Sequence, residues 1–299
     1  MTKFVLQVLA MVFMLCDHLC ATIMSEHIWL HWIGRLAYPI FAFMVVEGYF
    51  HTSNFKKYAK RMFLFAILAE IPLNLITAGG FIYPFHQNVM WTFLISLFVM
   101  RAMDKVLAMK GKPDASQISV ITGNIGKTLL CVAIGILGYG LCFITFVDYY
   151  GYGLLMVLVF FFSRKFRAWY LKATAKANME ELAVNSRRQE WPDPYVNHRG
   201  MVSGATAGMG MMIPALLSRA FELVAMYYIN VNMVRGEIRY FDIFGDEIGI
   251  TIQGLALLAL PLIWLYNGKQ GYHSKAWQYF CYAFYPAHML ILGLMWMFL

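Results

Sequence analysis

The chain has 299 residues, of which 61% are hydrophobic and 13% are charged, and its formal net charge is +8 at pH 7. Apolar runs of about 20 residues recur along its whole length, which predicts a polytopic membrane protein and excludes a large separate soluble domain. In that class of protein the positive excess lies in loops and orients the chain in the lipid bilayer, so no nucleic-acid partner is expected.

Nine membrane-spanning helices are predicted from the apolar runs, each to within a few residues. In chain order they cover residues 4–23, 28–49, 58–77, 88–109, 126–147, 151–166, 200–229, 248–266 and 277–298.

Lysine and arginine gather in alternate connections between these spans. The connections after the second, fourth, sixth and eighth spans are basic, whereas residues 24–27, 78–87 and 148–150 contain neither residue type. Because basic loops stay on the cytoplasmic side, this pattern places the N-terminus inside and the C-terminus outside. The expected fold is an all-α, polytopic membrane helix bundle of about nine transmembrane helices, with residues 1–299 forming a single domain. Residues 164–199 form a basic cytoplasmic insertion, which fits either an amphipathic helix on the membrane surface or a solvated linker.

Polar side chains from five predicted spans are expected in one layer of the membrane, at its middle and in its outer half. The first span runs outward, so Asp17 lies about 20 Å along it at a rise of about 1.5 Å per residue. An ion pair with a purely structural role would explain one such residue, but ionisable groups in hydrocarbon are costly and a cluster of them favours function. The members of this layer are Asp17, His18, Arg35, Glu70, Asn88 and His288.

These residue types suit proton transfer and the stabilisation of an anion. A carboxylate such as Asp17 can orient an imidazole, Arg35 can stabilise a developing oxyanion, and His18 can take a proton from an acceptor. Whether Asp17, Glu70 or Arg35 touches His18 is left open by the sequence.

A second polar set lies at the predicted inner surface. Glu47 ends the second span, and the stretch GYFHTSNFKKYAKR follows it. Lys57 and Arg61 share one helix face at a spacing of four. Basic residues here satisfy topology alone, but they also suit a phosphate-bearing cytoplasmic molecule. No pair of ligands has metal-site spacing, so no metal is expected.

Five sequence runs together resemble one family. They are DH at 17–18, GRLAYPIFAFMVVEGYFHTSNFKKYAKRM at 34–62, AEIPLN at 69–74, NVMWTFLISL at 88–97 and FYPAHMLIL at 284–292. In this order they resemble the TraX family, whose namesake is the membrane protein that N-acetylates conjugative pilin. The resemblance covers the first hundred residues and the last predicted span.

The resemblance implies an integral membrane acyltransferase in the bacterial cytoplasmic membrane. Such an enzyme would take an acetyl group from cytoplasmic acetyl-CoA and deliver it to a pilin, another peptide or a small-molecule acceptor at the outer side. His18 would be general base or transient acyl carrier and Arg35 the oxyanion partner, while Asp17 or Glu70 would orient the imidazole and His288 would position the acceptor. The expected donor-binding residues are Lys57, Tyr58, Arg61, Glu47 and His51, and the expected acceptor-binding residues are Asn88, Glu70, Tyr38 and Tyr285.

Two other classes of function fit the same residues. A proton-coupled transporter or flippase would use Asp17, His18, Arg35 and Glu70 as a relay. It would move its substrate unchanged and would not consume an acyl-CoA. A non-catalytic scaffold for a secretion or pilus machine would tolerate apolar replacements at Asp17, His18 and Arg35.

Overall fold

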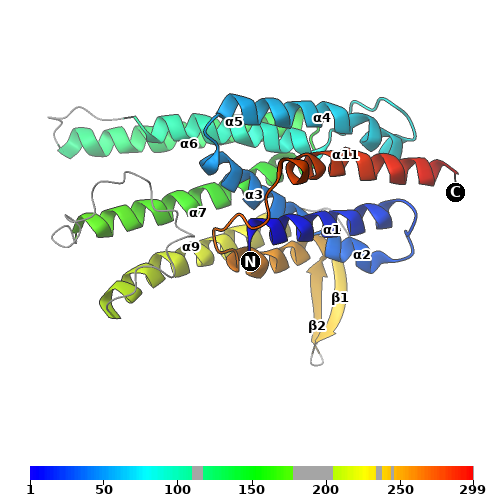
Figure 1. The fold of residues 1–299 in the computed structure, drawn as a ribbon. Coiled ribbons are helices and arrows are strands. Elements are labelled where there is room, and N and C mark those ends of the chain that lie inside the picture. Colours follow the sequence, from blue (N-terminus) through cyan, green and yellow to red (C-terminus); the bar gives the residue numbers. More distant parts are fainter. Residues whose placement is uncertain (110–116, 178–204, 234–237, 244–245, 299) are drawn as a thin grey trace. The chain divides into compact units, whose positions relative to one another are not determined.

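The structure is a computed structural model that describes residues 1–109, 117–177, 205–233, 238–243 and 246–298 (Figure 1). The prediction of a helical membrane protein is confirmed, because these residues are predominantly helical. The α-helices are α1 (Lys3–Ala21), α2 (Ile28–Gly34), α3 (Ala37–His51), α4 (Phe55–Ala78), α5 (Val89–Leu107), α6 (Gln117–Ile144), α7 (Tyr150–Ala177), α9 (Ala205–Asn232), α10 (Ala259–Trp264) and α11 (Lys275–Phe298).

Within the described ranges, five helices are long and apolar enough to cross a membrane. They are Lys3–Ala21, Ile28–His51, Phe55–Ala78, Ser119–Ile144 and Lys275–Phe298. The other four predicted spans fall on α5, on α7, on α9, and on the segment that ends with α10. The number of spans and their direction across the membrane stay predictions. Residues 164–177 continue α7, and the rest of the predicted insertion lies outside the described residues.

A small antiparallel sheet was not predicted. Strands β1 (Ile238–Ile243) and β2 (Asp246–Thr251) pair from Ile238 opposite Thr251 to Ile243 opposite Asp246. Isoleucine, tyrosine and phenylalanine in this stretch favour extended backbone. The predicted eighth span was therefore wrong to begin at residue 248, and helix begins only with the 3-10 helix η1 (Ile252–Leu258). The Thr251 hydroxyl starts η1 by accepting a hydrogen bond from the Gly254 N–H at 3.2 Å.

The chain folds into two compact units, each built from two separate stretches of sequence. The first unit contains residues 1–44 and 159–281. In it, α1 packs against α2, and α9 packs against η1 and α10. Phe43 lies at its core and makes edge-to-face contacts with Phe160 and Tyr266.

The second unit contains residues 45–158 and 282–299, and in it α5 packs between α4 and α6. Asparagine side chains start two of these helices. The Asn54 Oδ1 accepts from the Lys57 N–H at 2.9 Å, and the Asn88 Oδ1 accepts from the Met90 N–H at 3.0 Å. Gly79 ends α4 in the left-handed conformation, with φ of 64°. These caps set where α4 and α5 begin. They therefore set the positions of Lys57 and Asn88, which are two of the predicted site residues.

Candidate functional site

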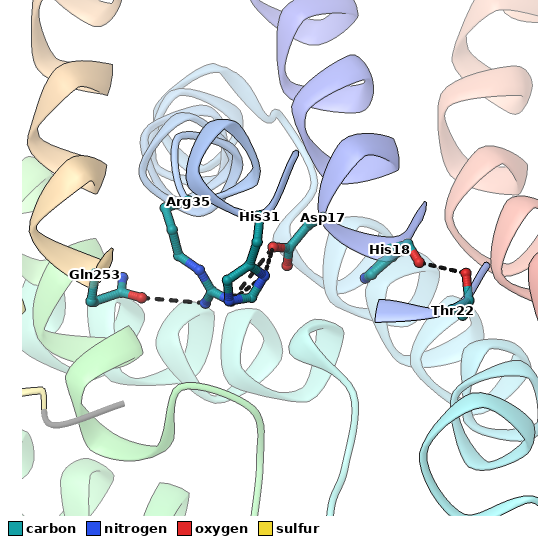
Figure 2. A network of polar contacts seen from close by, with 6 residues as sticks. All are labelled: Asp17, His18, Thr22, His31, Arg35 and Gln253. Carbon is teal, nitrogen blue, oxygen red and sulfur yellow. Dashed lines mark hydrogen bonds and ion pairs between the residues drawn. The ribbon is translucent and has the colours of Figure 1, made fainter. Parts of the chain in front are cut away.

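A carboxylate, an imidazole and a guanidinium meet where α1 packs against α2 in the first unit (Figure 2). Asp17 on α1 places Oδ1 2.7 Å from His31 Nδ1 and 3.5 Å from Arg35 Nη2. His31 and Arg35 share a helix face because they are four residues apart. Gly34 permits the close approach, since a Cβ at this position would lie 2.4 Å from the Cβ of Asp17. We call Asp17, His31 and Arg35 the central triad.

The carboxylate and the guanidinium both contact the His31 ring. A carboxylate only accepts, so His31 Nδ1 is the donor in the 2.7 Å contact with Asp17. Arg35 Nη2 lies 3.0 Å from Nδ1 and also contacts Nε2, so the guanidinium lies against the same ring. His31 therefore lies between the carboxylate and the guanidinium of the triad.

A chain of amides continues from Arg35 into the interior of the first unit. Arg35 Nη1 donates to Gln253 Oε1 at 3.3 Å, and Gln253 Nε2 donates to Asn230 Oδ1 at 3.0 Å. Asn230 Nδ2 in turn donates to the main-chain oxygen of Met226 at 2.7 Å. Gln253 and Asn230 are fully buried, whereas the His31 side chain is 33% exposed. The network thus has one end at the surface, at His31, and the other end in the interior, at Asn230.

The structure brings Asp17 and Arg35 together, in line with the sequence prediction, and adds two residues that were missed. His31 had a usable signal, since it precedes Arg35 by one helical turn. Gln253 had none, because it lies 218 residues from Arg35 in the chain. Figure 2 shows His18 beside the triad on α1, with its main-chain oxygen accepting from the Thr22 hydroxyl at 2.7 Å. Its role as general base stays a prediction.

Glu70 and Asn88 form a second polar cluster, in the second unit. Glu70 Oε1 accepts from the Asn88 N–H at 3.1 Å, from the Asn88 side-chain amide, and from Trp91 Nε1 at 2.7 Å. Asn88 is fully buried and also donates to the main-chain oxygen of Ala66 at 2.7 Å. Glu70 and Asn88, both expected in the polar layer, are thus in direct contact, and this contact joins α4 to α5.

The residues Tyr285–His288 of α11, sequence YPAH, lie in the same unit as this cluster. Tyr285 is buried there. His288 is buried, and its Nδ1 lies 2.6 Å from the main-chain oxygen of Phe284. Because a carbonyl only accepts, Nδ1 carries the proton and Nε2 is the acceptor when the ring is neutral. Tyr38, which is also predicted to contact the molecule that accepts the acetyl group, is buried in the first unit.

The predicted donor-binding residues form one patch at the junction of α3 and α4. Glu47 is buried, and its carboxylate lies 3.7 Å from His51 Nδ1. Tyr58 is also buried, packed so closely on Gly48 that a Cβ there would lie 2.7 Å from its hydroxyl. The Arg61 guanidinium lies 6.0 Å from the centre of the Tyr58 ring. The exposed cations beside them are Lys56, Lys57 and Lys60.

Sequence reasoning did not single out a buried ionic cluster around Glu222. This carboxylate on α9 accepts from Ser163 Oγ and Arg167 Nη2 of α7, the latter at 3.4 Å. It also accepts from Trp264 Nε1 of α10 at 2.6 Å. Glu222 stands inside the predicted span 200–229, so an acid within an apolar run was the available signal. The cluster ties three helices of the first unit together. Across the described parts of the chain, no three His, Cys, Asp or Glu side chains gather as metal ligands.

Comparisons with known proteins give one family and one relative. The model of the family described as "TraX protein" matches residues 3–229. The probable fimbrial assembly protein FimC, serogroup H1, of Dichelobacter nodosus is 37% identical over 73 residues. That match covers 23% of this chain and 30% of the relative, so it spans less than a third of the relative's length. No solved structure matches the chain.

Proposed function

The chain belongs to the TraX family, and we propose that it is a membrane-embedded acyltransferase. It moves an acetyl group from cytoplasmic acetyl-CoA to an amine or hydroxyl acceptor at the outer side of the bacterial cytoplasmic membrane. The family's association with pilin acetylation supports this reaction. The fimbrial assembly relative supports a pilus or fimbrial subunit as the acceptor, with its N-terminal amine as the acetylated group.

The central triad is the observation that carries the proposal. In the transfer, the acceptor nitrogen or oxygen forms a bond to the acetyl carbonyl carbon, and the carbon–sulfur bond breaks. The acceptor's proton passes to a base, and CoA leaves with the sulfur electron pair and takes up a proton. Arg35 donates hydrogen bonds to the oxyanion that develops on the carbonyl oxygen. His18, on the same helix as Asp17, is the proposed general base.

The α3–α4 patch suits the anionic end of the donor. Lys57 is exposed and Arg61 is partly exposed, so both can reach the phosphates of acetyl-CoA. Glu47 is buried at this patch, and its carboxylate lies 3.7 Å from His51 Nδ1. The ring of Tyr58 packs against the Arg61 guanidinium in a cation–π contact.

Residues of the second unit suit the acceptor. His288 offers Nε2 as a hydrogen-bond acceptor for an amine or hydroxyl, and Tyr285 lies on the same helix. Glu70 and Asn88 are further polar groups of the second unit. Tyr38, which is buried in the first unit, stays a predicted acceptor-binding residue.

Acetyl-CoA turnover by the purified protein in detergent tests the proposal. Free CoA thiol is followed with and without a synthetic peptide that has a free N-terminus, for the wild type, His18→Ala and Arg35→Ala. His273→Ala is the matched control, because His273 is exposed in the connection before α11. We expect peptide-dependent thiol release that falls by about 10²–10³-fold in Arg35→Ala, the loss typical of an oxyanion donor. A monodisperse wild type that neither binds nor turns over acetyl-CoA would refute the enzyme, and substrate flux in liposomes would then test transport.

A further inference from the structure

We infer that His31 and Gln253 are positioning residues that hold the Arg35 guanidinium in place for the reaction. The role of Arg35 rests on the proposed function, whereas its placement rests on its hydrogen bonds to these two side chains of the first unit. His31 meets one terminal nitrogen of the guanidinium, and Gln253 meets the other. With both ends engaged, the plane of the guanidinium is fixed.

His31 holds Arg35 by bridging it to Asp17. Its Nδ1 proton is directed to the carboxylate at 2.7 Å, and Arg35 Nη2 contacts the same ring, 3.0 Å from Nδ1. A ring held between a carboxylate and a guanidinium fixes the position of both. The geometry therefore gives His31 an orienting role, distinct from the proton transfer assigned to His18.

Gln253 can face Arg35 in only one orientation of its amide. Met226 offers a main-chain oxygen, which accepts only, so Asn230 must turn its NH₂ toward it. Asn230 then presents its oxygen to Gln253, whose NH₂ is used in that contact. The oxygen of Gln253 is left pointing at Arg35. The main-chain oxygen of Met226 on α9 thus determines that the oxygen of Gln253, and not its NH₂, faces the guanidinium.

The Gln253 amide is neutral, and this matters for the charge of Arg35. The carboxylate of Asp17 lies 3.5 Å from the other end of the guanidinium. A neutral acceptor at Nη1 orients the guanidinium without placing a second negative charge beside it, so positive charge remains to stabilise an oxyanion. A carboxylate in place of the Gln253 amide would orient Arg35 equally well but would neutralise it.

A double-mutant cycle on turnover separates positioning from independent catalysis. The variants are Gln253→Leu, His31→Phe and Arg35→Ala, together with the two doubles that contain Arg35→Ala, and His273→Ala is the control. We expect each positioning variant to lower kcat at least tenfold with the KM for acetyl-CoA unchanged. In the Arg35→Ala background neither change should lower kcat further. Losses that multiply in the doubles would overturn the inference, as would wild-type kcat in both single variants.

A second measurement does not depend on enzyme activity. The ¹⁵N shifts of histidine-labelled protein in micelles report which ring nitrogen carries the proton, and His31→Phe assigns the His31 signal. We expect a proton on Nδ1 of His31, and its ring ¹⁵N shifts to move in Arg35→Ala and in Gln253→Leu, while the His273 signal stays. Ring shifts of His31 that do not change in Arg35→Ala and Gln253→Leu would overturn the inference, as would an Nδ1 without a proton. If the wild type lacks turnover, the proposed function fails and this measurement still decides the positioning.

Discussion

Replacing Gly34 with alanine should push apart the two helices that carry the central triad. The new Cβ would lie 2.4 Å from the Cβ of Asp17 and 2.8 Å from its Cα. Ordinary contact begins near 3.4 Å, so α1 and α2 must separate locally by about 1 Å. The backbone of Asp17 cannot swing away as the end of a flexible side chain could.

The substitution should lower both the folding stability and the rate of acetyl transfer. Overpacking of this kind costs about 1–3 kcal/mol of folding free energy. A shift of about 1 Å would also stretch the 2.7 Å contact between Asp17 and His31 beyond hydrogen-bond distance. Misplacement of reacting groups by about 1 Å can cost about 10²-fold in rate. We therefore expect a large fall in kcat beside a modest fall in the unfolding midpoint.

Thiol release and thermal unfolding in the same detergent measure the two effects. Gly140→Ala is the matched control, because a Cβ at Gly140 in α6 meets no atom within 4 Å. Alanine in an open helical position should be neutral or stabilising by up to about 1 kcal/mol. Wild-type turnover and stability in Gly34→Ala would refute the close packing of α1 on α2, and with it the geometry assigned to the triad.

Three further changes test the other polar clusters. Glu222→Ala should destabilise the protein by about 3–5 kcal/mol, because it removes the carboxylate from the buried Arg167 contact; thermal unfolding checks this, and an unchanged midpoint would show that the cluster ties nothing together. Lys57→Ala combined with Arg61→Ala should raise the KM for acetyl-CoA by about 30-fold with little change in kcat, if each lost phosphate contact is worth about 1 kcal/mol; an unchanged KM would move the donor site elsewhere. Asn88→Ala should cost about 1–2 kcal/mol through loss of the α5 cap alone, and a loss below that in thermal unfolding would contradict the cap.

The helices and part of the site could be predicted because each depends on local pattern. An apolar run of membrane-spanning length forms a helix, since its backbone must satisfy its own hydrogen bonds. The contact between Asp17 and Arg35 followed from the depth that each residue reaches along neighbouring spans. Glu70 and Asn88 were placed at similar depth by the same reasoning, and the structure adds that they contact each other.

The remaining contacts depend on features that a window of sequence does not contain. Asp17 and His18 are neighbours in sequence, yet adjacent residues on a helix do not face each other. The imidazole that meets Asp17 therefore comes from the next helix, as His31. Gln253 lies on the 3-10 helix η1. The predicted span 248–266 treated the end of strand β2 and η1 as one membrane helix, because both are apolar. Its contact with Arg35 depends on how α9 and η1 pack, which is a property of the folded unit.

The amide chain inward from Arg35 suits the proposed oxyanion-stabilising centre, whose donors must be in place before charge develops. A proton relay through the protein interior needs groups that gain and lose protons in series. Inward from Arg35, the chain runs through Gln253 and Asn230 to the main-chain oxygen of Met226, and none of these three groups titrates. This branch can orient a guanidinium but cannot pass a proton onward from it. A relay through Asp17, His18, Arg35 and Glu70 would not use this branch, so acetyl-CoA turnover against substrate flux decides between the two functions.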